Sequence, residues 1–397
     1  MACITRLRSL GFQGEINLVT NESVLPYQRP PLSKQYLLGE MELDQLMFQP
    51  EEWYQEQNVT IHLNANAYEI DTSQKQLVLS SGQPIDFDKL VICTGATPIS
   101  LPQSVTQGLA NVFLIRDLPH VDAIKSEIME GKNVVIVGGG YIGLEAAAVM
   151  RKSGANVTLV EAQERILNRV ATKETADYFT DLHQSQGVDV RTNSMLSELK
   201  GEEGNVTHAV LSDGSSIAAD IVIVGIGVRP NIQLAENSDL EIDNGICVNE
   251  FCQTSHNDIY AAGDCASFIR NGERIRLESV QNANDQGEVI AAHICGEVKP
   301  YTATPWFWSD QYDTKLQIAG LNTGFNQTVT RAGSKPGGQS VWYYKDDQLL
   351  AVDAMNEPGA FMVTKRLLDL GKNPSLADIE NPETDLKKLM KELTRPK

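Results

Sequence analysis

An uninterrupted run of β-branched residues is the clearest pattern in the chain. Residues 134–137 are Val-Val-Ile-Val, which is typical of a parallel strand buried on both faces. A helical pattern over residues 144–153 follows and stops at Gly154, a residue that commonly ends helices. A second apolar run at 157–160 predicts the next strand. These segments together predict a β-α-β unit.

The beginning of the chain has the helix and the second strand of such a unit, without the first strand. A helix-like segment ends at Gly11, and residues 16–19 have the pattern of the strand that follows it. Aligning Gly11 with Gly154 puts the counterpart of Gly138 upstream of Met1. We therefore expect a first strand and a first glycine loop to lie outside this sequence. We also expect the chain to be less stable than an extended form.

Further patterns indicate how the rest of the chain is organised. Apolar runs at 90–93 and 221–228 predict strands, and residues 243–245 (Asp-Asn-Gly) predict a turn between two short strands. From about Thr302 onward, tryptophans, tyrosines and alternating strand-like segments surround a helix-like stretch at 361–370. We expect a separate C-terminal domain there.

Composition excludes several function classes. The 397 residues carry 33 basic and 52 acidic side chains, a formal net charge of −19, whereas nucleic-acid and anionic-lipid surfaces call for a basic face. Six cysteines are too few for a secreted disulfide scaffold. No apolar run approaches the ~20 residues of a membrane span, and the first residues lack a signal-peptide core. We expect a soluble, cytoplasmic protein of two or three domains, without nucleic-acid or membrane partners.

The strand at 134–137 is followed by a G-x-G-x-x-G motif. Gly138 suits the tight turn, Gly140 lets backbone approach a pyrophosphate, and Gly143 lets the helix pack closely on the strand. Tyr141 and Ile142 occupy the variable positions. Free N–H groups and the helix dipole at such a turn favour phosphates. Because a strand precedes the motif and a helix follows it, we predict dinucleotide binding.

Acidic residues after strands suggest the remaining ligand contacts. Glu161 ends the second strand, where it would accept hydrogen bonds from a ribose 2′-OH and favour NAD over NADP, although Arg165 and Arg169 weaken this inference. Glu145 fits either a nicotinamide contact or a favourable acid in the first helical turn. Asp264 fits either a ribityl contact or a helix N-cap.

Seven motifs in order resemble a known family. They are PYQRPPLSK at 26–34, CTGATP at 93–98, the glycine motif through Glu145, VGIGVRPN at 224–231, IYAAGD at 259–264, ESVQNA at 278–283 and PWFWSDQ at 305–311. The whole chain is similar to the FAD-dependent NADH:ferredoxin reductases, the group that contains putidaredoxin, rhodocoxin and rubredoxin reductases.

The resemblance implies an α/β, glutathione-reductase-like fold with two dinucleotide-binding domains and a C-terminal α/β domain. It divides the chain into an FAD domain (1–108 and 231–302), an NAD domain (109–230) and a C-terminal domain (303–397). The implied FAD contacts are Asn21, Glu22, Lys34, Ala67, Arg116, Asp264, Val280 and Trp308. The implied NAD contacts are Gly138, Gly140, Tyr141, Ile142, Gly143, Glu145, Glu161 and Gly227.

Within this set the implied roles differ. Lys34 would contact the flavin, Val280 would offer its backbone N–H to the pyrimidine edge, and Trp308 would lie beside the ring system. The family commonly has an acid after the strand at 16–19, where this chain has Asn21 followed by Glu22, so either residue is a candidate. No side chain is expected to act as a general acid or base, and no metal site is expected.

Three functions remain open at this stage. The first is a flavoprotein reductase that passes electrons from NADH through FAD to a [2Fe–2S] ferredoxin or a rubredoxin serving an oxygenase. The second is a disulfide oxidoreductase using Cys247 and Cys252, which is disfavoured because five positions along a strand place two side chains on opposite faces. The third is an NAD-binding protein that holds little FAD and has no reductase activity.

Overall fold

The computed structural model describes residues 1–395 and divides them into two compact units. Unit 1 consists of Met1–Gln28, Leu43–Thr97 and Val228–Ala303. Unit 2 consists of Arg29–Glu42 and Pro98–Gly227, together with the remainder of the chain from Thr304. Each unit therefore combines segments that are distant in the sequence. The division into FAD, NAD and C-terminal domains stays a prediction.

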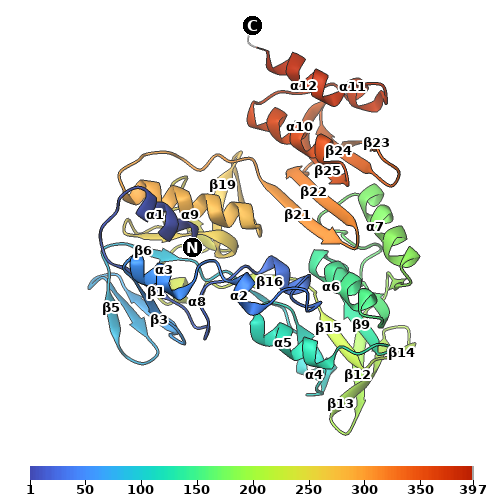
Figure 1. Cartoon of the computed structure of the whole chain (residues 1–397), viewed down its shortest axis with the longest axis horizontal. Helices are drawn as coiled ribbons and strands as arrows, with labels where there is room; N and C mark the ends of the chain where they lie inside the picture. The colour runs from blue at the N-terminus through green and yellow to red at the C-terminus, as the bar shows by residue number, and fades with distance from the viewer. Residues whose placement is uncertain (396–397) are drawn as a thin grey trace. The chain divides into compact units, whose positions relative to one another are not determined.

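Unit 2 contains a five-stranded, fully parallel sheet in the order β11-β10-β9-β15-β8. Helices α5 and α6 lie beside it (Figure 1). The elements are β8 (Val112–Leu114), α5 (Leu118–Glu127), β9 (Asn133–Val137), α6 (Tyr141–Lys152), β10 (Asn156–Val160), α7 (Lys173–Ser185), β11 (Asp189–Arg191) and β15 (Ile221–Val224). The predicted β-α-β unit is thus confirmed as β9-α6-β10, and Gly154 follows the helix with a positive φ of 84°.

A small antiparallel sheet covers part of the parallel one. It has the order β12-β13-β14 and packs with Val135, Val137 and Val222 in one apolar cluster. Its strands are β12 (Leu196–Glu202), β13 (Asn205–Leu211) and β14 (Ser216–Ala218). Two short helices, η1 (Pro30–Ser33) and α4 (Gln103–Thr106), also belong to unit 2. Burial on both faces explains why β9 and β15 are continuously apolar.

The C-terminal part of unit 2 is an antiparallel sheet in the order β21-β22-β25-β24-β23. Its strands are followed by three helices, shown in orange to red in Figure 1. The elements are β21 (Trp306–Gln311), β22 (Thr314–Gly320), β23 (Gln327–Ala332), β24 (Gln339–Lys345), β25 (Gln348–Met355), α10 (Pro358–Asp369), α11 (Leu376–Glu380) and α12 (Leu386–Thr394). Helix α10 buries Phe361 and Leu367 against Trp342 and Val352, which makes this region a core of its own.

Unit 1 contains the parallel strand pairs β1–β2, β6–β18 and β17–β19, and a pair of packed helices. Helix α1 lies against α9, where a Cβ on Gly287 would approach the backbone N of Cys3 to 3.1 Å, so glycine allows the helices to come close. The bounds are α1 (Ala2–Ser9), β1 (Ile16–Val19), β2 (Val59–His62), β6 (Leu90–Ile92), β18 (Ile259–Ala261) and α9 (Val280–Ile294). The expected upstream strand and glycine loop stay predictions.

The rest of unit 1 consists of short helices and mainly antiparallel strands. One sheet has the order β3-β4-β5 and another β17-β19-β20, while β7 pairs β16. The bounds are α2 (Leu43–Leu46), α3 (Glu51–Glu56), β3 (Ala67–Asp71), β4 (Gln76–Leu79), β5 (Pro84–Asp86), β7 (Ala96–Pro98), β16 (Val228–Pro230), α8 (Gln233–Glu236), β17 (Ile246–Val248), η2 (Gly263–Cys265), β19 (Ala266–Arg270) and β20 (Glu273–Arg276).

Two expectations about local structure are wrong. The apolar run 221–228 is two strands, because Gly227 has a φ of 120°, which breaks the extended backbone between β15 and β16. Cys252 does not continue the strand of Cys247, since it lies in a turn with a φ of 61°. Both cysteines are free thiols.

Two features are absent from residues 1–395, a membrane-spanning helix and a metal-binding cluster. Over residues 1–395, no helix is both long enough and apolar enough to cross a membrane. Within the same range, no group of three or more His, Cys, Asp or Glu side chains is arranged to hold a metal ion.

A buried carboxylate links the C-terminal sheet to α7. Asp353 on β25 is 1% exposed, and its Oδ2 atom accepts hydrogen bonds from Thr175 Oγ1 on α7 at 2.8 Å and from the Tyr343 hydroxyl. Burial raises the pKa of the Asp353 carboxyl to about 6, although the two hydrogen bonds act in the opposite direction. The ionised form is therefore costly at neutral pH.

We predict that Asp353→Asn changes how stability depends on pH. The folded carboxyl holds its proton up to about pH 6, whereas the unfolded one titrates near 3.8, so stability falls as pH rises between these values. Relative to the Asn variant, the unaltered protein should lose at most about 3 kcal/mol across that window and nothing further above it.

Melting temperatures of both proteins from pH 4 to 8 check this prediction. Burial lowers the pKa of His183, which costs both proteins stability as pH falls below 6.5, so the comparison cancels that effect. A difference in melting temperature that stays constant over the whole range would contradict the prediction.

Candidate functional site

The glycine motif forms a tight turn between β9 and α6. Gly138 has a φ of 108°, and a Cβ there would lie 2.4 Å from the carbonyl oxygen of Gly225. A Cβ on Gly143 would lie 2.1 Å from the carbonyl oxygen of Gly138. Gly140 is the N-cap of α6, and a Cβ there would meet nothing within 4 Å. The backbone therefore turns closely at two glycines and leaves space at the third, as a bound pyrophosphate needs.

Glu161 lies against this turn. Its Oε2 atom accepts the N–H of Gly139 at 2.7 Å, and its Oε1 atom accepts the N–H of Gln163 at 2.8 Å. A carboxylate has about four acceptor positions, so it can accept ribose hydroxyls as well. The structure thus brings the acid expected at the ribose together with the glycine loop expected at the phosphates.

The two nearby arginines differ in their surroundings. Arg165 donates to the Asn168 side chain at 2.7 Å and to the Ala171 carbonyl at 3.2 Å, so it stabilises its own loop. Arg169 is exposed, and its Nη2 atom would lie 3.4 Å from a Cβ placed on Gly227. Gly227 therefore lies beside a cationic side chain in the same unit.

The two variable positions of the motif have different environments. The Tyr141 ring lies 4.8 Å from the Phe307 ring on β21, and burial raises the pKa of its hydroxyl. Within residues 1–395 this buried hydroxyl has no hydrogen-bond partner. Ile142 is 43% exposed, so it presents an apolar side chain at the start of α6.

Glu145 is not in the first turn of its helix, contrary to expectation, because α6 begins at Tyr141. It is 4% exposed. Lys34 Nζ lies 2.7 Å from its Oε2 atom, and the same oxygen accepts the Ser33 hydroxyl at 2.6 Å. Its Oε1 atom accepts the Ser309 hydroxyl at 2.7 Å. A buried carboxylate needs this combination of a countercharge and hydrogen bonds.

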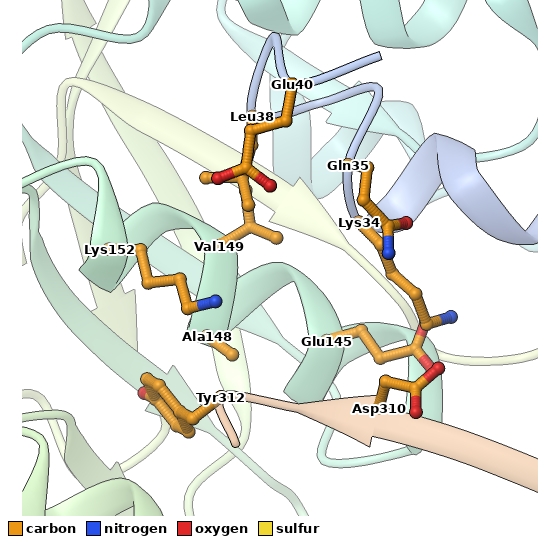
Figure 2. Close-up of a pocket in the computed structure, with 10 residues that line it drawn as sticks. All are labelled: Lys34, Gln35, Leu38, Glu40, Glu145, Ala148, Val149, Lys152, Asp310 and Tyr312. Carbon is orange, nitrogen blue, oxygen red and sulfur yellow. The ribbon is translucent and has the colours of Figure 1, made fainter. Parts of the chain in front are cut away.

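Local sequence explains how these three partners reach Glu145. Pro30 and Pro31 begin the short helix η1, which ends with Ser33 buried and Lys34 directly after it. The ammonium group also donates to the Pro30 carbonyl at 3.4 Å. Successive side chains of a strand point to opposite faces, and on β21 both Phe307 and Ser309 point toward α6. Figure 2 shows Lys34 and Glu145 pointing toward one another.

A small pocket opens next to this ion pair. Its volume is about 70 Å³, which is room for a few waters and not for a dinucleotide. Its charged side chains, shown in Figure 2, are Lys34, Glu40, Glu145, Lys152 and Asp310. The pocket therefore gives water access to the ion pair without being a nucleotide site itself.

Unit 1 holds two of the residues expected at a flavin. Asp264 follows β18, and Gly263 before it has a φ of 77° and donates its N–H to Gln286 at 2.8 Å. Val280 is the first residue of α9, where backbone N–H groups have no acceptor within the helix. A carboxylate after a parallel strand and an N–H at a helix start suit a hydroxylated, hydrogen-bonding cofactor such as FAD.

The other expected FAD contacts in unit 1 are Asn21, Glu22 and Ala67. Glu22 accepts the Tyr27 hydroxyl at 2.6 Å, whereas Asn21 is exposed. Ala67 is the first residue of β3 and pairs with Leu79. Their roles at a cofactor stay predictions.

Two expected FAD contacts belong to unit 2. Arg116 is half-buried, and its carbonyl accepts the Arg29 guanidinium at 2.9 Å. Trp308 lies on β21, and its ring centroid is 5.7 Å from that of Trp306. The structure brings Lys34 together with Glu145, and Glu161 with the glycines.

The polar residues that surround Glu145 were not among those expected at the site. Ser33 and Ser309 both lie inside motifs quoted for the resemblance, next to Lys34 and Trp308. For Ser309, the two-residue spacing with Phe307 and Gln311 was the available signal. His183, which contacts Gln311, had no signal, because a single histidine in a helix is usually structural.

Comparisons with known proteins agree with this geometry. The family described as pyridine nucleotide-disulphide oxidoreductase matches residues 1–287, and the family described as reductase C-terminal matches residues 306–390. A ferredoxin–NAD(P)+ reductase from Sphingomonas is 41% identical over 382 residues, covering 95% of this chain and 92% of that protein. Putidaredoxin reductase from Pseudomonas putida is 38% identical over 368 residues, covering 91% and 87%.

A solved structure extends the similarity to the whole fold. The covalent complex of putidaredoxin reductase with putidaredoxin has a TM-score of 0.96 and 34% identity, and the match covers 100% of this chain and 96% of that one. The expected resemblance and fold class are confirmed by these matches. The chain therefore belongs to the pyridine nucleotide-disulphide oxidoreductase family.

Proposed function

We propose that this protein is a flavoprotein oxidoreductase that takes electrons from NADH through FAD and passes them to a [2Fe–2S] ferredoxin or a rubredoxin. The observation that carries the proposal is the Lys34–Glu145 contact at 2.7 Å, directly behind the dinucleotide turn. It joins the side chain expected at the flavin to the side chain expected at the nicotinamide. The ferredoxin and putidaredoxin reductases described above support the choice of acceptor.

The residues of the dinucleotide turn would bind and orient NADH. The N–H groups at the start of α6 would receive the pyrophosphate, and Glu161 would accept the ribose hydroxyls. Glu145 and Lys34 would then hold the reacting ends of the two cofactors. Bound FAD would supply the chemistry itself, accepting a hydride and releasing single electrons.

The FAD contacts that we propose are Asn21, Glu22, Lys34, Ala67, Arg116, Asp264, Val280 and Trp308. Two of them already have geometry that suits the cofactor, namely the carboxylate of Asp264 after β18 and the backbone N–H of Val280 at the start of α9. A yellow protein with one FAD per chain supports the reductase. A colourless protein that still binds NAD would instead support the alternative without reductase activity.

The proposal includes a carrier that serves an oxygenase, either a cytochrome P450 or a ring-hydroxylating dioxygenase. It also includes a cytoplasmic location, for which all six cysteines being free thiols is the supporting observation. Dithiol chemistry is disfavoured, because burial raises the pKa of Cys252 to about 12 and a protonated thiol is a poor nucleophile.

We predict a clear preference for NADH over NADPH. The Glu161 carboxylate would repel a 2′-phosphate, and Glu161→Gln removes that charge while keeping an acceptor for the Gly139 N–H. The variant should narrow the ratio of kcat/KM for the two nucleotides by about tenfold, the equivalent of 1.4 kcal/mol. Ferricyanide reduction measures both nucleotides.

Glu164→Gln is the matched control, because it removes the same charge from an exposed position on the same loop. It should leave the ratio unchanged. Equal turnover of the unaltered protein with NADH and NADPH would refute the proposed role of Glu161.

We further predict that the protein reduces one-electron carriers and not disulfides. With NADH it should reduce a [2Fe–2S] ferredoxin or a rubredoxin, and Cys247→Ala/Cys252→Ala should keep that rate within about twofold because neither buried thiol takes part. Anaerobic absorbance changes of the carrier measure this. Rapid reduction of glutathione disulfide or lipoamide, lost in the double variant, would show that the assignment is wrong.

A further inference from the structure

A chain of hydrogen bonds runs from the Glu145 carboxylate into the interior of unit 2. The Ser309 hydroxyl donates to Glu145 Oε1 at 2.7 Å, and the Gln311 amide nitrogen donates to Ser309 Oγ at 3.2 Å. The Gln311 carbonyl oxygen lies 2.9 Å from His183 Nε2. His183 Nδ1 lies 3.4 Å from the Tyr312 hydroxyl. Four side chains are thus linked in series behind the ion pair.

The charge of Glu145 sets the direction of every bond in this series. An ionised carboxylate only accepts, so Ser309 must donate to it and must accept from the Gln311 amide. The Gln311 oxygen then faces His183, which has to donate from Nε2 and leave Nδ1 as an acceptor for Tyr312. Burial lowers the pKa of His183, in keeping with a neutral ring that donates once and accepts once.

These residues are also fully enclosed. Ser309, Gln311 and His183 are all 0% exposed. A buried polar group that loses its partner costs far more than an exposed one, and hydrogen bonds in series strengthen one another. The side chains are therefore held in one arrangement, and Glu145 is held with them.

The spacing of residues on helix and strand explains why the series fits. Tyr141 and Glu145 are four residues apart on α6, a rise of about 6 Å, and alternate residues on a strand are about 6.7 Å apart. Phe307 on β21 meets Tyr141, and Ser309 meets Glu145, so the two elements match position by position. The next alternate residue, Gln311, reaches His183 on α7.

We propose that Ser309 is a positioning residue for the reductase reaction, holding the Glu145 carboxylate in the orientation in which it faces Lys34. The proposal rests on the proposed function, in which Glu145 meets the nicotinamide end of NADH. Ser309 itself does not contact either cofactor; it acts through Glu145 Oε1. Without its hydroxyl that oxygen would lose its donor, and the carboxylate would be held only through Oε2, by Lys34 and Ser33, so its orientation would be less restricted.

Ser309→Ala tests this directly, with Ser340→Ala as the matched control. Both serines are buried in the same sheet, and Ser340 accepts the Trp342 indole N–H at 3.0 Å but has no part in the series. We expect Ser309→Ala to slow stopped-flow reduction of the flavin by NADH about tenfold and to weaken NAD+ binding in calorimetry. Ser340→Ala should lower only the melting temperature.

A double variant separates positioning from general damage. If Ser309 acts through Glu145, adding Ser309→Ala to Glu145→Gln should change the reduction rate and the NAD+ affinity by less than about twofold, because the carboxylate is already gone. Effects that multiply in the double variant would overturn the proposal. So would a Ser309→Ala rate no lower than that of Ser340→Ala.

The same measurements distinguish failure of this proposal from failure of the proposed function. If the unaltered, flavin-loaded protein is not reduced by NADH, the proposed function is wrong, and the positioning role falls with it. If Glu145→Gln slows reduction but Ser309→Ala does not, the reductase stands and only the role of Ser309 is refuted.

Discussion

The burial of one carboxylate, that of Glu145, constrains three separate segments of unit 2. Glu145 is 4% exposed, and an ionised group in such a place is tolerated only when it is paired and hydrogen-bonded. Lys34 provides the charge, and Ser33 and Ser309 provide the hydrogen bonds. These partners come from separate parts of the sequence, so the contacts of one side chain bring the segment Arg29–Glu42, helix α6 and the C-terminal sheet together.

Helix α6 consequently has two structural roles: it packs against the glycine loop, and it carries the buried Glu145. Its first turn closes on the glycine loop, where Gly143 permits contact with the Gly138 carbonyl. Its second turn carries Glu145 into the interior. Because the helix is rigid over this distance, the glycine turn and the buried ion pair keep a constant separation. The contacts that hold Glu145 in place therefore also hold the glycine turn at which a dinucleotide would be oriented.

Much of the dinucleotide-binding part could be predicted from the sequence, because its signals are local. The strands β9 and β10 are apolar runs, and the turn between β9 and α6 needs glycines at set positions. The break at Gly227 was missed because a glycine after an apolar run also fits a strand end. The setting of Glu145 could not be predicted, since its partners are long-range contacts that no local periodicity reports. Two of those partners, Ser33 and Ser309, are uncharged, so charge pairing in the sequence could not predict them either.

The order in which these partners are synthesised has a consequence for folding. Glu145 and Ser309 are 164 positions apart, so β9, α6 and β10 leave the ribosome well before β21 exists. During that interval the parallel sheet can form, but the Glu145 carboxylate on α6 lacks the Ser309 donor, and His183 on α7 lacks Gln311. Contacts of such high sequence separation form late, and partly completed sheets are prone to association. We therefore expect α6 and α7 to reach their final arrangement only after the C-terminal sheet has folded against them.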